Sequence, residues 1–198
     1  MRLVTFSARG QTRMGAEAGE WIIDLNRGAR AAATAARVRA LLPPSMEEFL
    51  AGGEEAMATA RDVISAIRGR LGAPREVTRL QREGVVWAPG EIRRLPPVPA
   101  PPKILCVGRN YAEHAREGGS EPPELPIFFG RFAHSLLGPG EPFVLPGVSP
   151  QVDFEGELVA VIGTGGREIP EARALESVAG YTVFNDISVR DFQRRTSQ

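Results

Sequence analysis

The most informative stretch of this 198-residue chain is Asp153-Phe154-Glu155-Gly156-Glu157, which runs directly into the apolar segment 158–162, Leu-Val-Ala-Val-Ile. Because side chains alternate along a strand, Glu155 and Glu157 point to one face, about 6 to 7 Å apart, while Phe154 points to the other. Two carboxylates on one face repel each other unless a cation neutralises them, so a hard divalent ion suits them. A solvated strand edge is the alternative interpretation, since Glu-x-Glu is a common pattern.

A third carboxylate follows a second predicted strand. Residues 181–184 read Tyr-Thr-Val-Phe, and Asp186 comes two positions after them. A helical turn is expected at 189–193, so Asp186 stands at a strand tip, where ligands often bind. Together with Glu155 and Glu157, this residue would supply three oxygen ligands to Mg²⁺, Mn²⁺ or Ca²⁺ and leave positions for substrate and water.

A histidine and a glutamate lie three residues apart in the segment 110–117, Asn-Tyr-Ala-Glu-His-Ala-Arg-Glu. If this segment is helical, His114 and Glu117 share one face, and the carboxylate can orient the imidazole and stabilise its charge. That arrangement suits a general base with its supporting acid. A surface ion pair is the alternative interpretation.

Three other features have plain structural interpretations. Cys106 lies in the apolar run 104–107 and is expected to be a buried strand thiol rather than a nucleophile. The glycine-rich segment 163–166 lacks the spacing of a phosphate-binding loop, so a hairpin turn is expected there. Asp191 is expected on the surface of a helix.

Composition excludes several classes of protein. The 24 basic and 24 acidic residues balance, so overall charge gives no reason to expect binding to nucleic acid or to an anionic membrane. A single cysteine excludes an intramolecular disulfide and a cysteine-rich zinc site. No apolar run reaches the ~20 residues of a membrane-spanning helix, and residues 1–7 show no signal-peptide core, so a cytoplasmic location is expected.

A proline-rich segment divides the chain. Five prolines occur in 96–102, which predicts a semi-rigid linker between an N-terminal α+β domain at 1–95 and a second domain at 103–198. Basic residues exceed acidic ones before residue 101, and acidic residues exceed basic ones after it. The second domain is therefore the better place to hold a cation.

Periodicity predicts the elements of both parts. Helices are expected at 46–50, where Ser45 is the N-cap, and at 54–71. Short strands are expected at 1–6, 21–25, 104–107, 127–129, 143–145, 158–162 and 181–184.

Taken in order, these motifs resemble the fumarylacetoacetate hydrolase family. The resemblance runs from Lys103 to Gln198 and is carried by segments 107–114, 138–140, 152–163 and 178–193. It implies a mainly β, α+β fold, in which a mixed β-sandwich roll of the fumarylacetoacetase C-terminal type follows a smaller N-terminal α+β domain. A homodimer is also implied by the resemblance.

The resemblance assigns roles to individual residues. Metal ligands are Glu155, Glu157 and Asp186, and a water-activating dyad is formed by His114 and Glu117. Residues expected to contact the substrate are Arg109, Tyr111, Arg131, Arg190 and Gln193. The arginines suit a bidentate pair with a substrate carboxylate.

The expected function is metal-dependent cleavage of a 2-oxo or 1,3-diketo acid, such as hydrolysis of a C–C bond in fumarylacetoacetate or an acylpyruvate, in the catabolism of aromatic compounds. A bound divalent ion, Mg²⁺ above all, would stabilise an enolate as a Lewis acid, and water activated by His114 would attack a second carbonyl. Decarboxylation or tautomerisation of an acid such as oxaloacetate is the first alternative. A non-catalytic homologue that binds metal and an organic acid is the second.

One departure concerns the end of the sequence. The family carries a Gly-Lys pair and a long β-rich stretch after the Arg-Asp-x-Gln motif, and neither occurs before Gln198. The only lysine, Lys103, lies in the wrong place to substitute. The roll is therefore expected to be incomplete at residue 198, and the sequence is expected to be a fragment of a longer enzyme.

Overall fold

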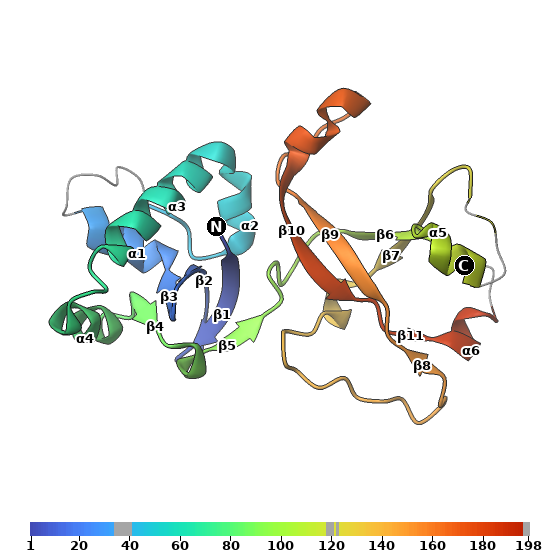
Figure 1. Ribbon diagram of the computed structural model, residues 1–198, viewed down its shortest axis with the longest axis horizontal. Helices are drawn as coiled ribbons and strands as arrows, with labels where there is room; N and C mark the ends of the chain where they lie inside the picture. Colours follow the sequence, from blue (N-terminus) through green and yellow to red (C-terminus); the bar gives the residue numbers. More distant parts are fainter. Residues whose placement is uncertain (34–40, 118–120, 122, 196–198) are drawn as a thin grey trace.

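The computed structural model of the chain describes residues 1–33, 41–117, 121 and 123–195. Figure 1 shows two parts: a sheet with several helices formed by the first half, and a set of paired strands formed by the second half. The overall class is α+β and mainly β in the second part, as the sequence predicted.

The N-terminal sheet is antiparallel throughout. Its strands are β1 (Leu3–Ala8), β2 (Gln11–Ala18), β3 (Trp21–Asp24), β4 (Val86–Trp87) and β5 (Arg93–Leu95), in the order β4-β3-β2-β1-β5. The helices are α1 (Leu25–Ala33), α2 (Met46–Ala51), α3 (Gly53–Arg68) and α4 (Pro74–Arg82), with the 3-10 turn η1 (Pro89–Glu91) before β5. Both α1 and α3 contact β2, so these helices pack on one face of the sheet.

Apolar burial explains why this part folds. On the helix side, Met14 of β2, Phe49 of α2 and Ile67 of α3 are fully buried in one cluster. On the other side, Phe6 packs against Trp87, with ring centroids 6.4 Å apart. The strands therefore bury side chains on both faces, which alternation along each strand allows.

Local signals correctly predicted some of these elements. Ser45 caps α2, where its hydroxyl oxygen accepts a hydrogen bond from the Glu48 amide at 3.1 Å. The predicted helix at 54–71 is α3, although it ends at Arg68. Strand β2 and helix α4 were not predicted.

The proline-rich segment lies against the N-terminal part. The Thr5 hydroxyl donates to the Pro97 carbonyl at 2.6 Å, and the Ala100 amide donates to the Glu47 carboxylate at 3.1 Å. Val98 packs against the helix-side core. Because proline already restricts the backbone, these contacts hold the segment in place at a low entropic cost.

The second part is made of strand pairs. Its elements are β6 (Ile104–Gly108), α5 (Ala112–Glu117), β7 (Ile127–Arg131), η2 (Ala133–Ser135), β8 (Val152–Asp153), β9 (Gly156–Ile162), η3 (Glu171–Ser177), β10 (Val178–Asn185), β11 (Ser188–Val189) and α6 (Arg190–Gln193). Antiparallel pairs form between β6 and β7, between β9 and β10, and between β8 and β11.

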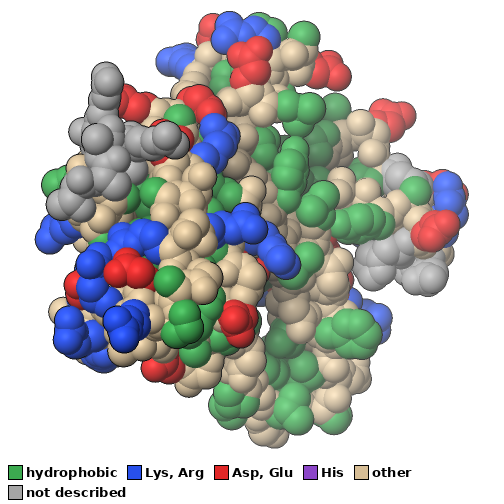
Figure 2. Space-filling view, turned by 60° about the vertical axis from the view of Figure 1, so that its left-hand side comes forward, with side chains coloured by type: hydrophobic (Ala, Val, Ile, Leu, Met, Phe, Trp, Pro, Cys, Tyr) green, Lys and Arg blue, Asp and Glu red, His purple; other side chains and the backbone are tan. Residues whose placement is uncertain are grey.

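Each long strand pair has two unlike faces. Burial alternates along β9 and β10, so that Glu157, Val159 and Phe184 are half-buried on what we call the inner face. The opposite side, the outer face, carries Leu158, Ile162, Tyr181 and Val183, which are all exposed. Figure 2 shows hydrophobic side chains open at the surface on the right of the view. None of the described helices is both long enough and apolar enough to cross a bilayer.

Two predictions about this part were wrong. Residues 143–145 form no strand, and Val144 and Leu145 are exposed, because no described segment pairs with them. Strands β9 and β10 are not joined by a tight hairpin turn, since residues 163–177, which include η3, lie between them. Apolar content alone does not create a strand without a hydrogen-bonding partner.

Candidate active site

Strand register brings the three predicted carboxylates to one face. Glu157 lies opposite Phe184, and Gly156 lies opposite Asn185. The Asp186 amide continues the ladder by donating to the Glu155 carbonyl at 2.9 Å. Because opposite residues in an antiparallel pair project to the same side, Glu155, Glu157 and Asp186 all belong to the inner face.

Two arginines contact these carboxylates. The guanidinium of Arg131, the last residue of β7, forms a short contact with Asp186, whose side chain is almost completely buried. The Arg190 Nη2 atom of α6 lies 2.8 Å from the Glu155 carboxylate and 2.8 Å from the Asp153 carboxylate. Both arginines were predicted to hold a substrate carboxylate, and in this structure they pair with carboxylates of the protein.

Supporting side chains were missed by the sequence analysis. The Ser188 hydroxyl donates to Glu155 at 3.1 Å, and the Asn185 side-chain oxygen accepts from the Glu155 amide at 3.1 Å. Asp153 accepts from Arg190 Nε at 2.9 Å. Each of these three residues lies within two positions of a predicted metal ligand, and this closeness in sequence is the signal that could have identified them.

Burial shapes the electrostatics of the inner face. It raises the pKa of the Asp186 carboxyl above its usual value; Arg131 opposes this effect, and the charge of Glu155 adds to it. Burial also raises the pKa of the Cys106 thiol, with a further contribution from Asp186. Cys106 is half-buried on β6 rather than fully buried, and the raised pKa favours an unreactive thiol.

The donor chemistry of the inner face fits a hard divalent cation. Glu155, Glu157 and Asp186 offer carboxylate oxygens, which Mg²⁺, Mn²⁺ and Ca²⁺ prefer, and a cation would offset the raised pKa of Asp186. Within the described part of the chain, no three His, Cys, Asp or Glu side chains are arranged closely enough to hold a metal ion. In the observed arrangement, Arg131 and Arg190 supply positive charge to Asp186 and Glu155.

The predicted dyad is only partly described. His114 and Glu117 belong to helix α5, as the helical interpretation required, but their side chains lie outside the described residues. The preceding Arg109 is exposed and has a left-handed backbone, with φ of 55°. The Tyr111 hydroxyl oxygen accepts from the Leu158 amide at 3.4 Å, which links the segment before α5 to β9.

Helix α6 connects the last predicted site residues. The Gln193 side-chain oxygen accepts from Arg190 Nη1 at 3.0 Å, so Gln193 lies beside the arginine that holds Glu155. Asp191 is not a plain surface carboxylate, because it accepts a 2.6 Å hydrogen bond from the buried Ser149. This bond ties the loop before β8 to α6.

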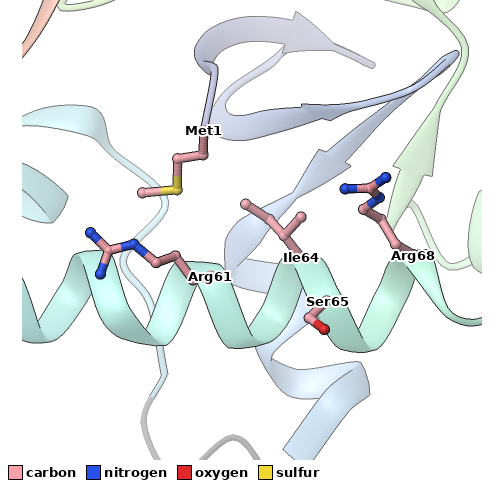
Figure 3. A pocket seen from close by; sticks show the side chains of 5 residues that line it. All are labelled: Met1, Arg61, Ile64, Ser65 and Arg68. Carbon is pink, nitrogen blue, oxygen red and sulfur yellow. The ribbon is translucent and has the colours of Figure 1, made fainter.

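A shallow groove on the N-terminal part offers no comparable chemistry. Figure 3 shows Met1 above helix α3, with Arg61 and Arg68 at the two ends of the groove and Ile64 between them. Arg61 already pairs with Glu54 at 2.7 Å, and both side chains are exposed. The carboxylates of the inner face therefore remain the better candidate site.

Known proteins are similar to the part of the chain that carries these carboxylates. The family model described as fumarylacetoacetate (FAA) hydrolase C-terminal matches residues 103–198, which include the strand pairs described above. The mitochondrial oxaloacetate tautomerase fahd2 of Xenopus laevis is 36% identical over 199 residues, covering 98% of this chain and 54% of that protein. The chain thus spans about half the length of the curated relatives it matches.

Solved structures show the same fold. Fumarylacetoacetate hydrolase from Exiguobacterium antarcticum aligns with a TM-score of 0.68 and 28% identity, covering 98% of this chain and 58% of that one. Maleylpyruvate hydrolase from Sphingobium sp. SYK-6, in complex with manganese(II) and pyruvate, aligns with a TM-score of 0.62 and 25% identity, covering 96% and 60%. The motifs, the fold and these relatives together place residues 103–198 in the fumarylacetoacetate hydrolase family.

Proposed function

We propose that this protein interconverts the keto and enol forms of a 2-oxo dicarboxylic acid of the oxaloacetate type, with a divalent ion as cofactor. The observation that carries the proposal is the set of carboxylates Glu155, Glu157 and Asp186 on one inner face. The relative named as an oxaloacetate tautomerase matches almost the whole chain, which favours tautomerisation over the hydrolysis expected first from the sequence.

The carboxylates would hold the ion, which supplies Lewis-acid charge to the oxygens of a 2-oxo acid. Other residues of the chain position the carboxylates that would hold the ion. Arg190 and Ser188 fix the orientation of Glu155 through a 2.8 Å ion pair and a 3.1 Å hydrogen bond. Such supporting contacts keep ligand oxygens in one direction and raise metal affinity.

Hydrolysis of a C–C bond is the second candidate. One solved relative is named maleylpyruvate hydrolase and holds manganese(II) and pyruvate. The sequence of α5 supports this activity, because His114 and Glu117 are spaced to share one helix face. A water-activating role for the dyad stays a prediction, as do Mg²⁺ as the native ion and a cytoplasmic location.

The test is an ultraviolet assay of oxaloacetate enol decay with the purified protein, with and without Mn²⁺. We expect Mn²⁺-dependent acceleration over buffer that contains the same metal, and loss of that acceleration in Glu155→Gln. Glu168→Gln is the matched control, because Glu168 is an exposed carboxylate on the connection after β9. Bound Mn²⁺ without any acceleration would contradict the proposal, and release of a cleavage product from an acylpyruvate would favour hydrolysis.

A further inference from the structure

A group of hydrogen bonds outside the carboxylates joins the loop before β8 to helix α6. The Ser149 hydroxyl donates to Asp191 Oδ1 at 2.6 Å and accepts from the Gln151 amide at 3.0 Å. The Gln151 carbonyl in turn accepts from the Arg190 amide at 2.8 Å. A side chain and a backbone carbonyl at the end of the loop therefore both bind α6, which lies beside β8 and β11 (Figure 1).

The Ser149 hydroxyl and the Asp191 carboxylate satisfy each other. Ser149 is 7% exposed, so its hydroxyl has little access to water and depends on an acceptor from the protein. The 2.6 Å distance is typical of a hydroxyl that donates to a charged carboxylate, and such a bond is stronger than one between neutral groups. Asp191 Oδ1 also accepts from the Phe192 amide at 3.0 Å, so one carboxylate oxygen joins the loop to the backbone of α6.

The position of α6 depends on such contacts, because the helix is too short to be stable alone. It has four residues, Arg190–Gln193, whereas isolated helices shorter than about 12 residues are marginal in water. Arg190 Nε holds the first residue of the helix to Asp153 of β8 at 2.9 Å. Asp191 adds a contact to the loop at Ser149, 42 positions away in the sequence.

The position of α6 also determines how the Gln193 amide is presented. Arg190 Nη1 donates to the Gln193 side-chain oxygen at 3.0 Å, so this oxygen faces the guanidinium and the NH2 group of Gln193 faces away from it. Gln193 is exposed, which leaves these N–H donors open to a ligand. Carboxylate and carbonyl oxygens, the polar atoms of a 2-oxo acid, are acceptors for such donors.

We propose that Ser149 and Asp191 are positioning residues for the proposed reaction: their hydrogen bond holds α6 so that the Gln193 amide points to the acid substrate. Both residues act through α6 rather than by touching the substrate. The inference rests on the proposed function, since it concerns how the same site orients its 2-oxo acid. It gives a role to two residues to which the family resemblance assigned none.

Loss of the bond between Ser149 and Asp191 should weaken substrate binding and leave the chemical step unchanged. In Ser149→Ala and in Asp191→Ala, we expect KM for the enol of oxaloacetate to rise on the order of tenfold, and kcat to stay within about twofold of the wild type. Simple loss of stability would act differently, because unfolded molecules lower the apparent kcat and leave KM unchanged. Since both substitutions break the same bond, the double variant should have about the same KM as either single variant.

Initial rates of enol decay with Mn²⁺ measure these constants for each purified variant. Ser135→Ala is the matched control, because it removes an exposed hydroxyl that donates to the Phe132 carbonyl at 2.8 Å, and its KM should equal that of the wild type. Asp191→Asn tests for rescue, since the amide oxygen can still accept from Ser149. Its KM should lie closer to that of the wild type than to that of Asp191→Ala.

The outcomes separate this inference from the proposed function. A wild-type protein that does not accelerate enol decay would overturn both. An active wild type whose KM is unchanged in Ser149→Ala and Asp191→Ala would overturn the inference alone. Additive effects on KM in the double variant, or no rescue in Asp191→Asn, would also overturn the inference alone.

Hydrogen exchange measured by NMR keeps the inference testable if an alanine variant does not fold. Ser149→Cys then takes its place, because a thiol is similar in size to the hydroxyl but is a weak donor. We expect the Arg190 amide, which donates to Gln151, to exchange on the order of tenfold faster than in the wild type, while the amides of β9 and β10 keep their rates. An unchanged Arg190 amide, or equal acceleration in β9 and β10, would overturn the inference.

Discussion

One buried carboxylate of the N-terminal part accepts hydrogen bonds from an arginine side chain and from a backbone amide. Asp24 is completely buried, accepts from Arg13 Nε at 2.7 Å and accepts from the Arg27 amide at 2.9 Å. Removing one partner of a buried ion pair leaves the other charge uncompensated. We therefore expect Asp24→Ala to lower the free energy of unfolding by about 3 to 5 kcal/mol, measured by urea denaturation.

Glu54→Ala is the matched control for Asp24→Ala, because it removes an ion pair with Arg61 in which both side chains are exposed. Such a pair contributes about 1 kcal/mol or less. Equal losses in the two variants would contradict a special role for burial. This role could not be predicted from local sequence, because Asp24 lies within the predicted strand 21–25 and Arg13 lies on a strand that was not predicted.

At the candidate site, too, some features could be predicted from the sequence and others could not. Alternation along one strand was enough to predict that Glu155 and Glu157 share a face, and the ladder contact of Asp186 with Glu155 agrees with it. The arginine contacts could not be predicted in the same way, because Arg131 reaches Asp186 from another strand pair. Contacts between elements depend on the packed fold, whereas faces of one strand depend on local periodicity.

At the level of elements, a turn in the loop before β8 connects the second part of the chain to the N-terminal sheet through direct contacts. A Cβ atom on Gly138 would lie 2.6 Å from the Arg94 carbonyl oxygen, so only glycine allows this approach to β5. The Gly138 amide donates to Glu141 at 2.7 Å, and Glu141 also forms a short ion pair with Arg93 of β5. These contacts hold the loop between β7 and β8 against the N-terminal sheet.

The pKa of Glu141 carries a prediction about pH. The hydrogen bond from Gly138, together with Arg93, lowers the pKa of this carboxyl below its ordinary value of 4.5. A lowered folded-state pKa stabilises the fold above the unfolded pKa, and this stabilisation is lost as pH falls through the folded pKa. We expect the melting temperature to fall more steeply from about pH 5 to pH 3 in the wild type than in Glu141→Gln.

Glu168→Gln serves as the reference for Glu141→Gln, because Glu168 is an exposed carboxylate outside this turn. If the melting temperature falls equally steeply with pH in the wild type and in Glu141→Gln, the charge of Glu141 does not stabilise the fold.

The prediction of a strand failed close to this turn, at 143–145, where an apolar run without a partner strand forms a loop. A hydrophobic pattern predicts a strand only when the fold supplies a neighbour.

For the whole molecule, the outer face of β9 and β10 raises the question of assembly. Leu158 lies directly opposite Val183, and these side chains are 67% and 85% exposed. Soluble monomers rarely leave large contiguous apolar surfaces open, and such surfaces usually mark an interface. We expect a second copy of this chain to cover the outer face, in agreement with the homodimer that the family resemblance implies.

Light scattering of the purified protein tests this assembly. The wild type should have twice the chain mass of 21.4 kDa, whereas Val183→Lys should shift it toward the single-chain mass, because a buried unpaired charge opposes association. Val148→Lys is the matched control, since Val148 is also exposed but lies on the loop before β8. A wild-type mass of one chain, or equal dissociation in both variants, would contradict a homodimer built on the outer face.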